Sequence, residues 1–113
     1  MKIKNQVQLV GRLGANPEVK VLENGNKFAR FSVAVTEVYV SKSGEKTTDV
    51  QWHAVVAWNS LATIAERILF KGTQVTIDGK LVKRSYVNKE GEKRSATEII
   101  ANELFVSHQP QVA

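Results

Sequence analysis

One segment of this sequence has the apolar spacing of a helix, whereas the segments on both sides of it alternate like β-strands. Within residues 59–72, NSLATIAERILFKG, the apolar stripe consists of Leu61, Ile64, Ala65 and Ile68. Spacings of three and four positions place these side chains on one face of a helix. Asn59 or Ser60 can cap its first turn, and Gly72 is placed to end it. The fold must therefore accommodate one helix in a chain that consists mostly of strands.

The flanking segments alternate apolar and polar residues, which is the pattern of half-buried strands. Strands are predicted at 5–14, 18–22, 27–40, 49–58, 73–87 and 92–108. Asn24-Gly25 is the strongest short signal for a hairpin turn, and a polar loop built around Gly44 is expected at 41–49. Glycine inside a strand suits a bulge or a bend, and such glycines are Gly11, Gly14 and Gly79. The strands are therefore expected to curve.

When 5–22 is counted as one strand interrupted at Pro17, the order is three strands, one helix and two strands. A single helix between the third and fourth of five strands, together with bulge-type glycines, is typical of a small closed barrel of the oligonucleotide-binding type. An open sandwich with a covering helix is the alternative. The predicted fold class is thus all-β, a five-stranded OB-fold barrel. A chain of 113 residues is one domain, expected to span 1–108 and to be followed by a short disordered end at 109–113.

Composition limits the partners and the chemistry. Lys and Arg number 16 against 11 acidic residues, and the net charge of +5 favours polyanions such as nucleic acid or anionic membrane surfaces. The chain has no cysteine, which excludes disulfides, thiolate metal sites and cysteine nucleophiles. No apolar run approaches the roughly 18 residues that span a bilayer, and the N-terminal MKIKNQVQLV does not resemble a signal peptide. A cytoplasmic location is therefore expected.

The two tryptophans of the chain, Trp52 and Trp58, lie in the predicted strand 49–58. Side chains alternate between faces along a strand, and an even number of positions separates these two residues. Both indoles are therefore expected on one face. They could both belong to the core, or they could form a surface on which a flat ligand lies.

The aromatic residues divide into two groups. Phe31, Phe70 and Phe105 stand within apolar patterns and are expected inside the barrel. The second group, interleaved with basic residues, consists of Tyr39, Trp52, Trp58 and Tyr86. A single ring of this kind usually covers a half-buried sheet face or a subunit contact. Four rings spread over three strands fit better a platform on which nucleobases stack while nearby cations neutralise phosphates. Because a duplex hides its base faces, such a platform selects single strands without reading their sequence.

Five segments carry a family resemblance. They are VQLVGRLGANPEVK (7–20), NGNKFARFSVAV (24–35), QWHAVVAWN (51–59), IAERILFKGTQVTIDGKL (64–81) and KRSYVNKEGEKR (83–94). In order and spacing they resemble the bacterial single-stranded DNA-binding protein family over nearly the whole chain. The resemblance implies the OB-fold, a homotetramer that wraps single-stranded DNA, and a role in coating and protecting exposed strands during replication, recombination and repair. It implies neither catalysis nor a cofactor.

The resemblance also implies roles for individual residues. The stacking aromatics fall on Tyr39, Trp52, Trp58 and Tyr86. The phosphate contacts fall on Lys42, Lys71, Lys83 and Arg84. The DNA-contacting strand comprises Trp52, His53, Ala54, Val55, Val56, Ala57 and Trp58. His53 is implied to be a subunit contact, and no metal is expected, because the only other histidine is His108 and no carboxylate cluster accompanies either.

The end of the chain departs from the family pattern. Family members usually continue into a linker rich in Gly, Pro or Gln, with an acidic tip that recruits other DNA-processing proteins, whereas this sequence ends in SHQPQVA. The resemblance therefore does not extend to that recruitment. A shortened chain and a member without the tail would have the same sequence.

Three other functions remain open. A small basic barrel can be a metal-dependent nuclease, but the carboxylates that would hold the metal are scattered along this sequence. A protein-interaction barrel would bury the face of Trp52 and Trp58 against its partner. RNA binding would use the same stacking and phosphate contacts, because only contacts to the 2′-hydroxyl distinguish RNA from DNA. Single-stranded DNA ranks first because of the resemblance.

Overall fold

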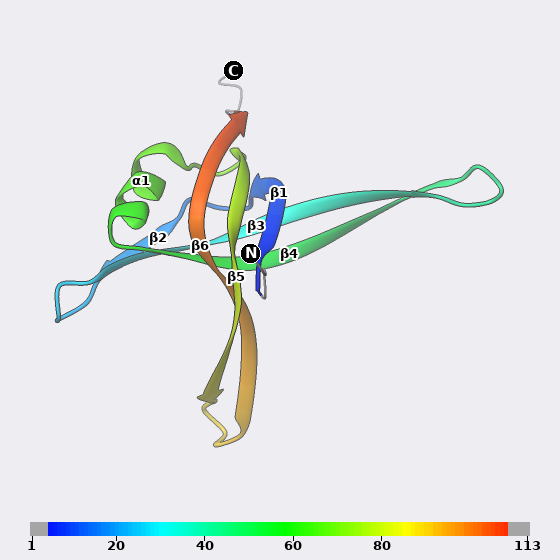
Figure 1. Ribbon diagram of the computed structural model, residues 1–113. Coiled ribbons are helices and arrows are strands. Elements are labelled where there is room, and N and C mark those ends of the chain that lie inside the picture. The colour runs from blue at the N-terminus through cyan, green and yellow to red at the C-terminus, as the bar shows by residue number, and fades with distance from the viewer. Residues whose placement is uncertain (1–4, 109–113) are drawn as a thin grey trace.

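The computed structural model describes residues 5–108 (Figure 1). Its elements are β1 (Val7–Leu13), β2 (Glu18–Val21), β3 (Lys27–Val40), β4 (Lys46–Trp58), α1 (Ser60–Ile68), β5 (Gln74–Val87) and β6 (Lys93–His108). The loop predicted at 41–49 is shorter in the structure. Strand β4 pairs with β3 as far as Lys46, which lies opposite Val40. The end predicted at 109–113 lies outside the described residues.

Five strands close into a barrel, which confirms the predicted OB-type architecture. The ring runs β1–β5–β6–β4–β3, and β1 closes it by pairing with β3. At the closure Arg12 lies opposite both Gln74 of β5 and Ala34 of β3. A Cβ on Gly11 would collide with the carbonyl of Ala34, so a glycine here lets β1 change partners. The helix follows β4 because the predicted strand 5–22 divides into β1 and β2.

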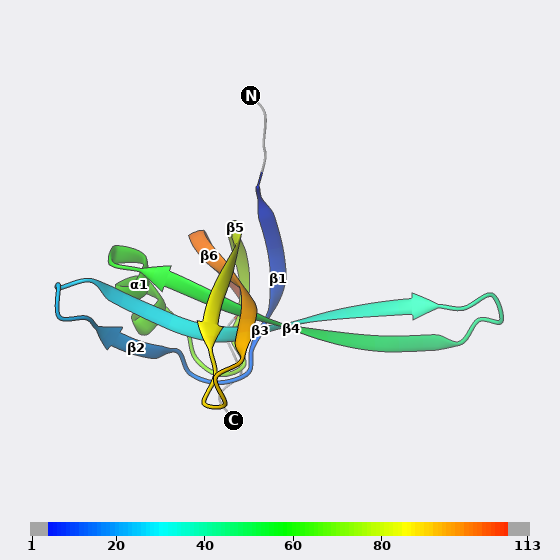
Figure 2. The same cartoon turned by 90° about the horizontal axis from the view of Figure 1, so that it is seen from below.

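Two hairpins extend beyond the barrel as arms (Figures 1 and 2). The β3–β4 arm, residues 36–50, runs from the pair Thr36 and Val50 to its loop. The β5–β6 arm, residues 83–97, runs from the pair Lys83 and Thr97 to its own loop. Most side chains in both arms are exposed. Figure 2 shows the β3–β4 arm leaving the barrel on the side away from α1.

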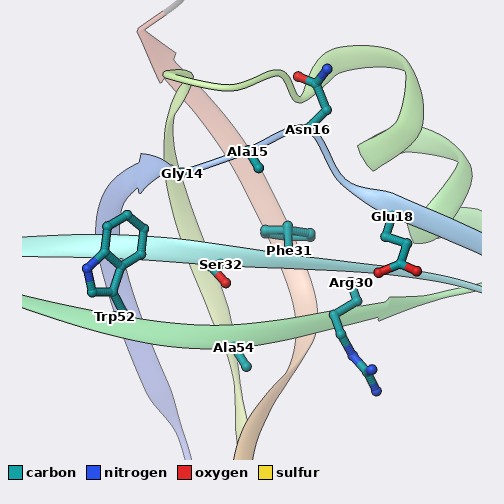
Figure 3. A pocket seen from close by; sticks show the side chains of 9 residues that line it. All are labelled: Gly14, Ala15, Asn16, Glu18, Arg30, Phe31, Ser32, Trp52 and Ala54. Atoms are coloured by element: carbon teal, nitrogen blue, oxygen red, sulfur yellow. The ribbon is translucent and has the colours of Figure 1, made fainter.

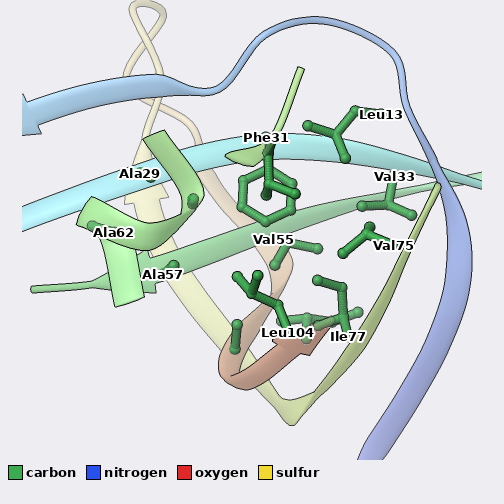
Figure 4. Packing of buried hydrophobic residues seen from close by; sticks show 14 residues of the cluster. Leu13, Ala29, Phe31, Val33, Val55, Ala57, Ala62, Val75, Ile77 and Leu104 are labelled. Carbon is green, nitrogen blue, oxygen red and sulfur yellow. The ribbon is translucent and has the colours of Figure 1, made fainter. Parts of the chain in front are cut away.

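The core fills the barrel and continues beneath α1 (Figure 4). The largest completely buried apolar side chains are Leu69, Ile77, Ile99, Val33, Val55 and Val75. The helix packs against β3, β4 and β6. Its contact residues Ala62 and Ala65 are completely buried, as are Ala29 and Ala57 on the strands. Small side chains on both surfaces allow the helix to lie close to the sheet.

The helix differs from its prediction in length and in its buried stripe. It ends at Ile68 rather than near Gly72, and Leu69 continues in extended conformation into the core. Of the predicted stripe, Ala65 is buried and Leu61 and Ile68 pack against the core, whereas Ile64 is exposed. The second completely buried helix residue is Ala62. The predicted cap Asn59 instead accepts a hydrogen bond at its side-chain oxygen from the backbone N–H of Lys27, at 3.1 Å. Within residues 5–108, no helix has the length and apolar character needed to cross a membrane.

Two of the three phenylalanines predicted inside the barrel are exposed. Phe31 is buried, whereas Phe70 and Phe105 are largely open to solvent. Phe70 lies in the turn between α1 and β5, where the chain reverses outside the core. The pairing of β6 with β5 skips Asn102, and one extra residue reverses the alternation of side chains. Beyond this bulge Leu104 faces the core, and Phe105 therefore points outward.

Candidate nucleic-acid interface

Alternation along β4 places both tryptophans on the outside of the barrel. Val55 and Ala57 are completely buried in the core, so Trp52 and Trp58, at the other parity, point outward on one face, as their spacing predicts. Of the predicted DNA-contacting strand 52–58, only alternate side chains therefore reach this face.

The same outward parity continues onto the neighbouring strands through the register of the sheet. We call the resulting surface the outer face. Its residues are Phe28, Arg30, Ser32 and Ala34 of β3, Trp52, Ala54, Val56 and Trp58 of β4, Val82, Arg84 and Tyr86 of β5, and Ala96, Glu98 and Ile100 of β6. Three of the four predicted stacking residues thus share one surface, which crosses the barrel and continues onto the β5–β6 arm.

Trp52 lies at one end of a hollow in the outer face (Figure 3). The hollow has a volume of about 440 Å³ and extends past Ser32 and Ala54 to Arg30. The six-membered ring of the indole lies against Gly14: a Cβ there would stand 2.6 Å from Cζ3 of Trp52. Since Trp52 is 60% exposed, the backbone supports one side of the ring and leaves the rest open to a ligand.

Trp58 lies beside a second hollow of about 340 Å³, which we call the Trp58 hollow. Its apolar lining is formed by Phe28, Val56, Trp58, Val82 and Ile100. The ring centroids of Phe28 and Trp58 are 5.4 Å apart and their planes are tilted by 49°, a favourable geometry for an aromatic pair. Trp58 is still 39% exposed. The hollow thus has an apolar floor, an aromatic wall and an open side.

Charged residues complete the lining of the Trp58 hollow, and they are Arg30, Lys83, Arg84 and Glu98. Glu98 lies between two of the cations: its Oε2 is 3.3 Å from Nη2 of Arg30, and its Oε1 is 3.6 Å from Nε of Arg84. The guanidinium carbon of Arg30 also lies 5.7 Å from the centroid of the Phe28 ring. Three cations against one carboxylate leave the hollow with a positive excess.

Tyr86 lies on the β5–β6 arm, opposite Arg94. It lines a third hollow, of about 440 Å³, together with Lys83, Lys93 and Arg94. The predicted stacking residue Tyr86 and the predicted phosphate contact Lys83 are therefore brought together, with two further cations that sequence reasoning did not select.

Tyr39 and Lys42 lie far along the β3–β4 arm. Tyr39 has the parity of the core residues Phe31 and Val33, so the register does not place it on the outer face. Its phenol donates a hydrogen bond to Glu37. This bond, reinforced by the negative charge of Glu37, raises the pKa of Tyr39 above its ordinary value. Lys42 lies in the loop that closes the arm.

Lys71 and His53 occupy different surroundings. The backbone N–H of Lys71 donates to the side-chain oxygen of Asn16 at 2.8 Å, and Asn16 lines the hollow of Trp52. Lys71 is therefore adjacent to a residue that lines that hollow, but it does not line the hollow itself. His53 is half-buried opposite Val33, at the inward parity of β4. Within the described part of the chain, no group of three or more His, Asp or Glu side chains could hold a metal ion.

The chain matches a known protein family. Residues 4–107 match the Single-strand binding protein family. The chain belongs to this family, as its sequence segments predict. It is 39% identical over 100 residues to the single-stranded DNA-binding protein of Neisseria meningitidis serogroup A, an alignment that covers 88% of this chain and 58% of that protein. The chain thus spans just over half the length of this relative.

Two further similarities extend the comparison. The chain is 40% identical over 101 residues to single-stranded DNA-binding protein 1 of Xylella fastidiosa, covering 88% of this chain and 74% of that protein. Among solved structures it is similar to the Plasmodium falciparum SSB complex with ssDNA, with a TM-score of 0.82 and 28% identity over 97% of this chain and 98% of that chain. The overall fold is therefore shared with that structure.

Sequence reasoning toward this single-strand binding fold missed Phe28, Arg30 and Glu98 on the outer face. Phe28 has the parity opposite to that of Phe31, and this signal was available in the sequence. No sequence signal shows that Glu98 lies between Arg30 and Arg84, because the contact joins three different strands. Such a cluster follows only from the register of the closed barrel.

Proposed function

We propose that this chain binds single-stranded DNA without regard to its sequence, and that it coats and protects exposed strands during replication, recombination and repair. The observation that carries the proposal is the outer face, where two exposed tryptophans each lie beside a hollow. Arg30 lines both hollows, and Lys83 and Arg84 also line the hollow of Trp58. Membership of the single-strand binding protein family supports it. So does the similarity to a family structure in complex with single-stranded DNA.

Stacking supplies the sequence-tolerant part of the binding energy. Trp52, Trp58 and Tyr86 each offer a ring to one base on or beside the outer face, and Tyr39 offers a fourth from the β3–β4 arm. Each stacked base contributes about 1–3 kcal/mol, a range established for proteins of this kind, including this family. All four bases have an apolar π-face, so the rings do not distinguish among them. A DNA strand that stacks on all four rings therefore runs from the β3–β4 arm across the barrel to the β5–β6 arm.

Cations supply the salt-dependent part. In this proposal the DNA phosphates are contacted by Lys42, Lys71, Lys83 and Arg84. Their distribution follows the path of the rings: Lys42 lies on one arm, Lys71 next to Asn16 of the Trp52 hollow, and Arg84 in the lining of the Trp58 hollow. Each neutralised phosphate releases condensed counterions, so affinity falls as salt rises.

The proposed binding is non-catalytic and needs no cofactor. Because only the open form is bound, the protein melts secondary structure by mass action. Assembly into a homotetramer, with His53 at a subunit contact, joins several sites and raises avidity without new contacts to DNA. The proposed location is the cytoplasm, in association with the nucleoid.

Tryptophan fluorescence tests the proposal directly, because the only two tryptophans lie on the outer face. We expect oligo-dT to quench the emission strongly, duplex DNA of the same length to have little effect, and higher salt to weaken the quenching. Oligo-rU in the same titration compares RNA with DNA. Absence of quenching by any strand would contradict the proposal and favour a protein-interaction barrel with this face buried against a partner.

A further inference from the structure

Glu98 is an unusual residue to find in a surface proposed to bind a polyanion. It is only 8% exposed, and it lines the Trp58 hollow. A carboxylate there repels phosphate, so charge alone would predict that it weakens DNA binding. Its two contacts suggest a different role, because both are to guanidinium groups that flank the same hollow.

The geometry leaves much of each arginine available. The contact of Glu98 with Arg84 is to Nε, and the side chain of Arg84 is 52% exposed. Its contact with Arg30 is to Nη2, and the side chain of Arg30 is 40% exposed. Nε of Arg30 is buried and has no hydrogen-bond partner among residues 5–108. An arginine carries five donors in a fixed fork, so neither guanidinium is saturated by the single carboxylate.

The carboxylate of Glu98 also offsets the electrostatic repulsion between Arg30 and Arg84. Arg30 and Arg84 are both positively charged and lie on different strands. Each contacts a different carboxylate oxygen of Glu98. Without a negative charge between them the two guanidiniums would separate. Both would then lose the orientation that the contact with Glu98 gives them, and Arg30 would also shift on the Phe28 ring that it contacts. Fixing a planar donor fork in advance lowers the ordering cost of binding a phosphate.

We propose that the Trp58 hollow is a one-nucleotide subsite in which Arg30 and Arg84 together bind a phosphate of single-stranded DNA, and Glu98 is the residue that positions them. The inference rests on the proposed function and adds Arg30, Phe28 and Glu98 to it. In this subsite the base stacks on Trp58, over the apolar floor of the hollow. Phe28 supports both the indole and Arg30 from the other side. The phosphate lies against the two guanidiniums.

The test uses the sign of the effect. Glu98→Gln removes one negative charge from the hollow, so charge alone predicts tighter binding of oligo-dT, whereas loss of positioning predicts weaker binding. Glu98→Asp keeps the charge but shortens the reach, so charge alone predicts no change. We expect both variants to bind about three- to tenfold more weakly, as for partial loss of a charge-assisted contact. The salt slope of log affinity should become shallower by about one phosphate contact.

Matched controls separate this outcome from general effects. Glu103→Gln makes the same charge change on the same strand, at an exposed position outside the outer face, and should bind as the unaltered chain or slightly more tightly. Affinities are normalised to the folded fraction from circular dichroism. NMR signals of the arginine Nε–H groups give a second readout: those of Arg30 and Arg84 should broaden or shift in both Glu98 variants.

The outcomes distinguish the inference from the function on which it depends. If the unaltered chain fails to bind oligo-dT, the proposed function and this inference are both overturned. If the unaltered chain binds and both Glu98 variants bind equally well or better, the proposed function stands and the positioning role of Glu98 is overturned. Weakened binding in the Arg30→Lys and Glu98→Asp variants, without a further loss in the double variant, would support a shared action.

Discussion

The indole of Trp52 lies against the backbone of Gly14, so closely that a Cβ on residue 14 would stand 2.6 Å from Cζ3 of the ring. The contact joins the end of β1 to the middle of β4, and it gives an exposed aromatic side chain a fixed support. A ring held in advance loses less side-chain entropy when a base stacks on it.

Gly14→Ala should therefore displace the Trp52 ring. The nearest atoms belong to an exposed side chain that can move, so we expect stability to change by less than about 1 kcal/mol. Affinity for oligo-dT should fall, and thermal melting together with a titration would measure both effects. In a Trp52→Ala background the same substitution should have no effect on binding. Unchanged affinity in the single variant would show that the support is not needed.

Trp52→Ala should weaken binding to homopolymers of every base by about 1–3 kcal/mol, a range established for stacking proteins that include this family. The ring is 60% exposed, so folding and assembly should survive its removal. Phe105→Ala, which removes another exposed ring outside the outer face, is the matched control. If Trp52→Ala unfolds the chain while affinity per folded molecule is kept, Trp52 is a structural residue.

Lys71→Ala should weaken oligo-dT binding less than Trp52→Ala does, and should reduce the salt slope of log affinity by about 1, because one phosphate contact is lost. Arg67→Ala removes an exposed cation from α1, away from the outer face, and should leave the slope unchanged. Equal slopes in the Lys71 variant and the unaltered chain would remove Lys71 from the phosphate contacts.

The phenol of Tyr39 should ionise only at a pH above its ordinary value of 10.0, because Glu37 accepts its hydrogen bond and repels the phenolate. The folded state holds this proton more tightly than the unfolded chain. Any stability that it contributes is therefore present below pH 10 and lost as the pH rises through the raised value. Absorbance titration near the phenolate band, in a Tyr86→Phe background, would follow Tyr39 alone. Glu37→Gln should lower the pKa of Tyr39, and an unchanged titration would contradict the stated cause.

Gly79→Ala should destabilise the fold by about 1–3 kcal/mol, the usual cost of overpacking a tight site. A Cβ at this position would collide with the backbone carbonyl of Ile100 on β6, and a backbone atom cannot move aside as the Trp52 ring can. Thermal unfolding of this variant beside Gly14→Ala would compare a fixed neighbour with a movable one. Equal melting temperatures would show that the β5–β6 pairing relaxes easily here.

Alternation predicted much of this molecule. It gave the strands, the hairpins and the common face of Trp52 and Trp58, since each depends on neighbours along the chain. It failed at Phe105, because the bulge at Asn102 reverses the alternation and nothing in the sequence locates it. It also failed at Ile64, because the helix docks on the barrel through its alanines, whose small size permits close approach.

The strand and helix content, the parity of most strand side chains and the excess of positive charge follow from the sequence alone, because these are local or additive properties. Which residues meet depends on the folded arrangement: Gly14 lies under Trp52, Phe28 beside Trp58, and Glu98 between Arg30 and Arg84. These contacts join strands that are distant in the chain, and their register is set by closure of the barrel, which one residue more or less in any strand would change.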